Sequence, residues 1–161
     1  SIPQGNAGDG GATFVSRALG DISITGGTIA MQGSNASTGG SIPANTSRGG
    51  NGGGSGGIIC IDGEGSVTIS STLNTFGGNG TNNGGPGATG GGGGGGGPIL
   101  VISRSQNLSL TGTTQVQAGS AGSNAGTGVA GGGGGGCFGQ GGSASDAAEN
   151  GIVIQNATLF Y

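Results

Sequence analysis

The chain has 161 residues, of which 48 are glycine and 4 are proline, and its three arginines and six acidic residues give a formal net charge of −3. Because it contains no histidine and no lysine, it offers no imidazole base or imidazole metal ligand, no Schiff-base lysine and no Walker phosphate loop. Three arginines are also too few for a nucleic-acid-binding surface. The composition predicts a structural or adhesive protein rather than an enzyme, with no catalytic, cofactor or metal site.

The first predicted strand follows directly on glycine. Residues 10–15 read Gly-Gly-Ala-Thr-Phe-Val, and segments in which apolar and hydroxyl residues alternate follow at 21–25 and 28–32. Such alternation is typical of strands with one buried face. We therefore expect three short strands, separated by turns, before the next glycine-rich segment.

The same pattern recurs along the chain, which indicates a repeat architecture. Glycines run straight into apolar residues again at 56–61, 96–102 and 150–154. Later strands of each copy are expected at 66–70, 72–76, 107–111, 114–118 and 156–160. The chain is thus predicted to be a single elongated domain, residues 1–161, with approximate repeats at 10–55, 56–95 and 96–149 and a terminal half-repeat at 150–161.

Glycine-rich excursions separate the strand units, at about 33–57, 77–98 and 119–151, and two of them contain unbroken glycine runs, 90–97 and 131–136. An α-helix is not expected there, because each interior glycine costs about 1 kcal/mol relative to alanine. A flexible linker rarely recurs inside every copy of a repeat, and collagen needs a strict Gly-X-Y register that is absent.

Polyglycine II is the conformation that remains for these excursions. It is an extended three-fold helix whose N–H and C=O groups point outward, so several such helices can pack closely and bond to one another. We therefore predict an all-β fold, with a repetitive solenoid- or sandwich-like strand body, polyglycine II excursions and essentially no α-helix.

Glycine runs that feed directly into Ile- and Val-rich strands, as at 54–61 and 93–102, resemble the tail-tip adhesins of T-even-like phages and other glycine-rich surface proteins. The resemblance is compositional and covers residues 10–161 loosely. It implies a sandwich of packed polyglycine II helices whose terminal loops touch a host receptor. The regular three-strand unit, and the lack of aromatic-rich loops, depart from that family.

Few residues stand out as candidate sites. Cys60 and Cys137 either form one disulfide or are two separate small buried side chains. Asn35, Asn45 and Asn79 begin Asn-x-Ser/Thr triplets in predicted loops, where they are glycan acceptors in a secretory host, although a chain of this composition also yields such triplets by chance.

Charged residues recur at comparable places after the first strand of each copy. Arg17 and Arg104 occupy such positions in copies one and three, and Asp62 lies nearby in copy two. If the copies stack in order, Asp62 falls between the two arginines and forms a surface ladder.

No apolar run approaches the roughly 20 residues of a membrane span, so a membrane-spanning protein is not expected. The neutral polar composition suits an extracellular location, on a cell or virion surface. The terminal half-repeat has no partner further along the chain, and it is expected either to complete its own sheet or to join a neighbouring subunit. The predicted assembly-strand residues are Ile152, Val153, Ile154, Leu159, Phe160 and Tyr161.

Two functions are carried forward. The first is a self-assembling subunit of a filament or surface fibre, whose partners are copies of itself joined by strand addition or end-to-end stacking. The second is a phage or bacterial adhesin that binds a host-surface protein or glycan through the tips of its glycine-rich loops. An ice-binding protein ranks below both, because the threonines form no clear ladder.

Overall fold

The computed structural model describes residues 5–38, 49–82, 90–123 and 148–156. This part of the chain is all β: it contains no helix, and about a third of its residues lie in short strands. The first copy holds β1 (Thr13–Ala18), β2 (Ile22–Ile24) and β3 (Thr28–Ala30). The later strands are β4 (Ile58–Gly63), β5 (Val67–Ile69), β6 (Thr72–Asn74), β7 (Ile99–Ser103), β8 (Leu108–Leu110), β9 (Thr114–Gln115) and β10 (Val153–Gln155).

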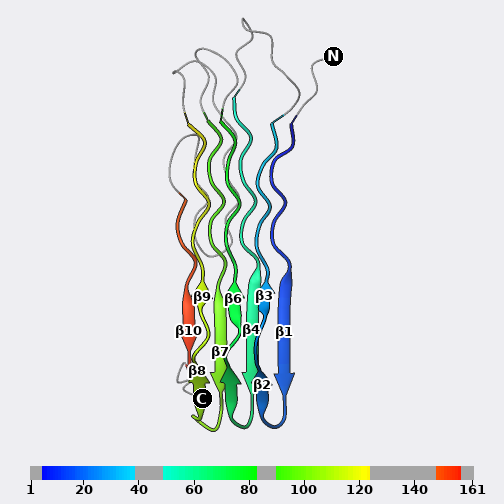
Figure 1. Cartoon of the computed structure of the whole chain (residues 1–161), viewed down its shortest axis with the longest axis vertical. Coiled ribbons are helices and arrows are strands. Elements are labelled where there is room, and N and C mark those ends of the chain that lie inside the picture. The colour runs from blue at the N-terminus through cyan, green and yellow to red at the C-terminus, as the bar shows by residue number, and fades with distance from the viewer. Residues whose placement is uncertain (1–4, 39–48, 83–89, 124–147, 157–161) are drawn as a thin grey trace, which may run out of the picture.

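Equivalent strands of successive copies pair with one another in three sheets, ordered β1-β4-β7-β10, β2-β5-β8 and β3-β6-β9. Every pairing is parallel. Each copy, counted from the glycine-rich segment that leads into its first strand, forms a long hairpin. The hairpins stand side by side (Figure 1). The arm that ends in β1, β4, β7 or β10 runs down in that view, and the arm that carries the other strands runs up. We call these the descending and ascending arms.

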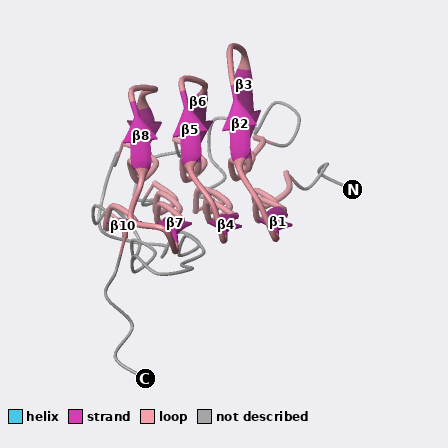
Figure 2. Cartoon of the chain, turned by 90° about the horizontal axis from the view of Figure 1, so that it is seen from below, coloured by secondary structure: helices cyan, strands magenta, loops and turns pink. Residues whose placement is uncertain are grey.

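The two arms form two layers, with one row of strands made by β1, β4, β7 and β10 and a second row above it that begins with β2, β5 and β8 (Figure 2). Alternate side chains of β4 and β7 point between the layers, as the alternating burial of these strands shows. The core between the layers is aliphatic, because these strands place one apolar side chain inward at every second residue. Its buried side chains are Ile22, Ile59, Ile61, Val67, Ile69, Leu73, Ile99 and Val101.

Beyond the strands, both arms continue as extended glycine-rich segments. The descending segments are 5–12, 49–57, 90–98 and 148–152, and the ascending segments are 31–38, 75–82 and 116–123. Backbone hydrogen bonds link neighbouring segments at every third residue. The N–H groups of Gly91, Gly94 and Gly97, for example, donate to the carbonyl oxygens of Thr81, Gly78 and Thr75 at 2.9, 2.8 and 2.9 Å.

Other residues of the same segment bond to different neighbours, since the carbonyl oxygens of Gly92 and Gly95 accept from the second descending segment. Bonds between segments with a three-residue period are the pattern expected of polyglycine II. Glycine is required because there is no room for a side chain. A Cβ built on Gly93 would lie 1.9 Å from the carbonyl oxygen of Gly119, and one on Gly94 would lie 1.9 Å from that of Gly54.

Several expectations are modified or lie outside the described residues. The third strands are shorter than predicted: β9 ends at Gln115 instead of reaching Ala118, because the following residues already belong to the three-residue bonding pattern. The glycine run 131–136 and most of the strand expected at 156–160 lie outside the described residues.

Candidate functional site

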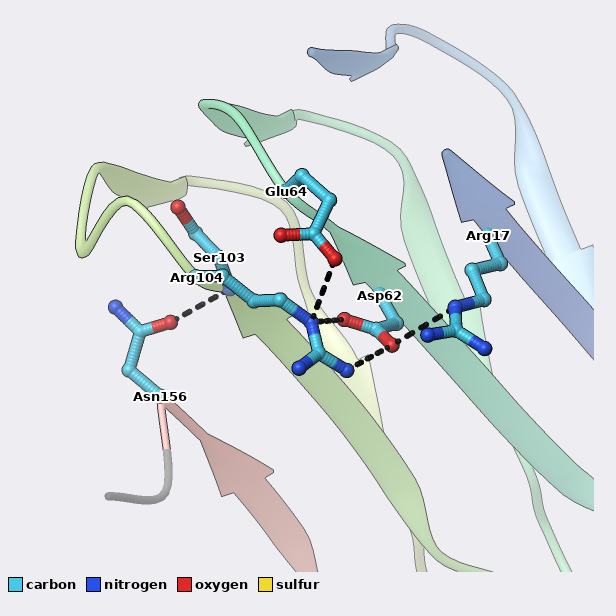
Figure 3. A network of polar contacts seen from close by, with 6 residues as sticks. All are labelled: Arg17, Asp62, Glu64, Ser103, Arg104 and Asn156. Carbon is cyan, nitrogen blue, oxygen red and sulfur yellow. Dashed lines mark hydrogen bonds and ion pairs between the residues drawn. The ribbon is translucent and has the colours of Figure 1, made fainter. Parts of the chain in front are cut away.

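A row of charged side chains crosses the outer face of the β1-β4-β7 sheet (Figure 3). Parallel register pairs Arg17 of β1 with Asp62 of β4. Arg104 follows β7 and lies two residues beyond Ile102, the register partner of Asp62, so its long side chain reaches back to that carboxylate. Arg104 binds Asp62 with two hydrogen bonds, from Nε to Oδ1 at 3.0 Å and from an Nη to Oδ2 at 2.8 Å. Arg17 lies on the other side, with Nε 3.5 Å from Oδ2. The predicted ladder is therefore confirmed.

Glu64 extends this row, with its carboxylate 3.4 Å from Arg104 Nε. The Asp62 side chain is only 15% exposed, whereas that of Arg17 is 67% exposed. The hydrogen bonds from Arg104 lower the pKa of Asp62, partial burial opposes that shift, and the charges of Arg104 and Arg17 add to it. The row thus ties three copies together on a polar surface, and Asp62 is its centre.

Cys60 lies on β4, two residues before Asp62, and is half-buried. Burial raises the pKa of its thiol, and the nearby Asp62 carboxylate raises it further. Among the described residues Cys60 forms no disulfide. Cys137 lies outside them, so the Cys60–Cys137 bridge stays a prediction.

The predicted glycan acceptors Asn35 and Asn79 lie on ascending segments and are exposed. Each binds the next copy through its side-chain oxygen. Asn35 Oδ1 accepts from the N–H of Asn79, and Asn79 Oδ1 accepts from the N–H of Ser120, both at 2.8 Å. These asparagines therefore satisfy backbone donors on the outer face of the glycine block, and their glycosylation stays a prediction. Asn45 lies outside the described residues.

The edge made by the first copy differs from the inner copies in the rows nearest the strands. Each row contains the equivalent residues of successive copies. In these rows, a side chain on one copy would point at a backbone carbonyl oxygen of the preceding copy. Cβ atoms built on Gly54, Gly57 and Gly78 would lie 1.8–1.9 Å from such oxygens. The first copy carries a side chain where the second and third copies have glycine, in the rows Asp9–Gly54–Gly94, Ala12–Gly57–Gly97 and Ser34–Gly78–Gly119. The half-repeat has Ala148 in the first of these rows and Gly151 in the second.

A side-chain oxygen also replaces a missing neighbour at this edge. The N–H groups of Gly54 and Gly94 donate to the preceding ascending segment, at Ser34 and Gly78. Among the described residues no ascending segment precedes Asp9, and its equivalent N–H donates to Ser34 Oγ at 2.7 Å. The glycine part of this edge is therefore closed by its own side chains. The rows farthest from the strands do not share this contrast, because Asn51 and Thr81 carry side chains in the second copy.

The other edge is formed by the third copy and the half-repeat. β10 pairs with β7, so this part of the half-repeat completes the sheet of its own chain. Asn150 Oδ1 accepts from the N–H of Ala118 at 2.8 Å, whereas the equivalent N–H groups of Gly33 and Gly77 donate to the next ascending segment. The described assembly-strand residues are Ile152, which is 40% exposed, and the half-buried Val153 and Ile154. Leu159, Phe160 and Tyr161 lie outside the described residues.

The strands themselves stay open at these edges. β1, β2 and β3 are terminal strands of their sheets, as are β8, β9 and β10. Near the first edge, Val15 is 65% exposed and Leu19 is 90% exposed. An exposed apolar strand edge is a surface on which another chain can add.

The long segments of the hairpins share one end, opposite the turns. The ascending segments finish, and the first three descending segments begin, at the end opposite the hairpin turns (Figure 1). Residues 39–48, 83–89 and 124–147 connect one copy to the next, so the connecting segments differ in length while the described segments are regular.

In the described part of the chain, no helix could cross a membrane, and no group of three or more Cys, Asp or Glu side chains could hold a metal ion. No family model, curated protein or solved structure matches this chain.

Sequence reasoning identified the ion-pair row but missed the edge residues Asp9, Ser34 and Asn150. Aligning the copies by strand register, rather than by composition, is the signal that would have found them.

Proposed function

We propose that this protein is a non-enzymatic extracellular adhesin of a cell or virion surface, which binds a host-surface protein or glycan through the connections at its glycine end. The observation that carries this proposal is the contrast between a regular glycine block, which side chains close at several positions of its edges, and the unequal lengths of the segments that connect its copies, residues 39–48, 83–89 and 124–147. Binding sites are commonly placed on variable loops held by a rigid scaffold. A block in which glycine backbones bond in two directions is such a scaffold.

Exchanging one connection tests the proposal. In the first variant, residues 124–147 are replaced by the seven-residue sequence of 83–89, and in the second, residues 39–48 are replaced in the same way. Fluorescently labelled full-length protein is then applied to intact cells of several Gram-negative bacteria and to a glycan array. We expect wild type to label at least one surface, and at least one variant to lose that labelling while keeping its circular dichroism spectrum and thermal midpoint.

Two results would contradict the proposal. One is that wild type binds none of the cells or glycans. The other is that both variants bind as strongly as wild type, which would place recognition elsewhere on the molecule.

A filament or surface-fibre subunit is the second candidate, and a different observation favours it. The strand edges are open, and Val15 and Leu19 leave apolar surface at one of them. Strand addition would use this part of the edge. End-to-end stacking of the glycine segments meets the Asp9, Ala12 and Ser34 side chains, so the geometry supports the adhesin better. Electron microscopy of the purified chain separates the two: ordered filaments indicate the fibre subunit, and monomers that label cells indicate the adhesin.

A further inference from the structure

The outer face of the ascending segments carries a groove of about 450 Å³ that crosses all three copies. Parallel register aligns Gln32, Phe76 and Gln117 in one row across it. Phe76 is half-buried, and each of its neighbours in the row is an exposed amide. The lining residues are Gln32, Gly33, Ser34, Asn35, Phe76, Gly77, Asn79, Gln117 and Ala118.

The amides of the adjoining row are held in fixed orientations. Asn35 Oδ1 and Asn79 Oδ1 each accept a backbone N–H at 2.8 Å, so their oxygens are engaged with the protein. Gln32 Oε1 likewise accepts from Asn74 Nδ2 at 3.3 Å. An amide whose oxygen is fixed in this way presents its NH₂ group as a donor. The groove therefore offers oriented donors beside an aromatic ring.

The chemistry of the lining selects the ligand. No lining side chain is charged, so the groove gives no ionic contact for an acidic or basic ligand. An apolar ring face next to a few placed amides suits a ligand that alternates C–H surface with hydroxyl groups, which is the surface of a sugar ring.

The polar surface continues along the segments beyond the groove. Three residues further on, Asn82 and Ser123 occupy the next outward positions of the second and third copies, and Asn82 Oδ1 accepts from the N–H of Ser123 at 2.8 Å. The fixed-amide arrangement is therefore repeated in the direction of the segment. A ligand longer than one sugar unit can follow it.

We propose that this groove binds a neutral polysaccharide, with one sugar ring stacked on Phe76 and its hydroxyl groups bonded to the Asn35, Asn79 and Gln117 amides. The site lies on the side of the block rather than at its connected end. It does not depend on the function proposed above, and the exchanges of connections leave it unchanged.

Affinity electrophoresis of the full chain in gels containing dextran, galactomannan or hydroxyethyl cellulose tests this site. We expect at least one polymer to retard wild type. Phe76→Gln should raise the apparent Kd for that polymer about tenfold, since stacking on the ring is lost. Phe76→Gln makes the row Gln-Gln-Gln and keeps its polar surroundings, so the fold is expected to survive. Phe76→Tyr keeps a ring and should bind like wild type, and Val15→Ser, on the opposite layer, controls for general surface changes.

A wild-type chain that none of the three polymers retards would overturn the proposal. So would a Phe76→Gln variant that keeps its thermal midpoint and binds as strongly as wild type. If Phe76→Gln fails to fold, Gln117→Ala replaces it, and unchanged binding by that variant and by Asn79→Ala would also overturn the proposal.

Discussion

At the residue scale, Asp62 has the most specific role among the described charged groups. Its carboxylate receives two hydrogen bonds from Arg104 and faces Arg17, and both arginines come from other copies. Its pKa is lowered mainly by the Arg104 hydrogen bonds. A carboxylate with a lowered pKa stabilises the fold above its ordinary pKa of about 3.9, and the contribution is lost as the pH falls through the lowered value.

Asp62→Asn is therefore expected to lower the free energy of unfolding at pH 7 by about 0.5–1 kcal/mol, because a partly exposed ion pair is screened by solvent. Urea unfolding at pH 7 and at pH 2 measures the difference between wild type and variant. That difference should shrink toward pH 2, because the wild-type carboxylate takes up a proton as the pH falls through its lowered pKa. Glu64→Gln, whose partner lies at 3.4 Å, is the control and should change stability less. An equal difference at both pH values would show that the ion pair is not its source.

At the element scale, the glycine segments are packed elements rather than linkers. Most glycines of the inner segments have a neighbouring backbone on the side where a Cβ would stand, so packing requires glycine at positions that differ in their partners. Gly93 faces the ascending segment of its own copy, and Gly94 faces the preceding descending segment. The turn residue Gly20, by contrast, has nothing within 4 Å of an added Cβ.

Gly93→Ala is expected to destabilise the protein by about 3 kcal/mol or more, because the new Cβ would have to displace backbone rather than a flexible side chain. Thermal and urea unfolding measure this loss. Gly20→Ala is the matched control, and its effect should stay within about 0.5 kcal/mol. Equal, small effects of both substitutions would show that the segments are loosely associated chains.

At the scale of the whole molecule, the edges decide whether a chain of stacked copies ends or continues. Asp9, Ala12 and Ser34 occupy rows in which the second and third copies have glycine, so a further copy placed against them would bring a carbonyl oxygen into each side chain. Terminal copies that differ from the inner ones are the usual way in which a repeat protein stays soluble. This edge therefore limits stacking in the glycine half, while the strand half keeps exposed Val15 and Leu19.

The triple variant Asp9→Gly, Ala12→Gly, Ser34→Gly is expected to associate where wild type stays monomeric. The reason is that removal of the side chains exposes a glycine surface like those of the inner copies. Sedimentation velocity over a hundredfold range of protein concentration measures the difference. Val15→Ser in the same background tests whether the strand edge contributes. A wild-type chain that already forms long polymers at micromolar concentration would contradict the closed edge and favour the fibre subunit.

The sequence by itself determined the strand copies, their parallel order and the all-β class, because the change from glycine to alternating apolar residues is local and repeats along the chain. It also indicated the Arg17–Asp62–Arg104 row, since charges at comparable places in stacked copies come close together, although Arg104 lies two residues beyond the register partner of Asp62. Only the tertiary structure decided which neighbouring backbone lies beside each glycine, because a run of glycines has no alternation of side chains from which a buried side could be predicted. It also decided the roles of Asp9, Ser34 and Asn150, because these residues act at edges where a neighbouring segment is missing. Finally, it placed Phe76 beside Gln32 and Gln117, which come from other copies.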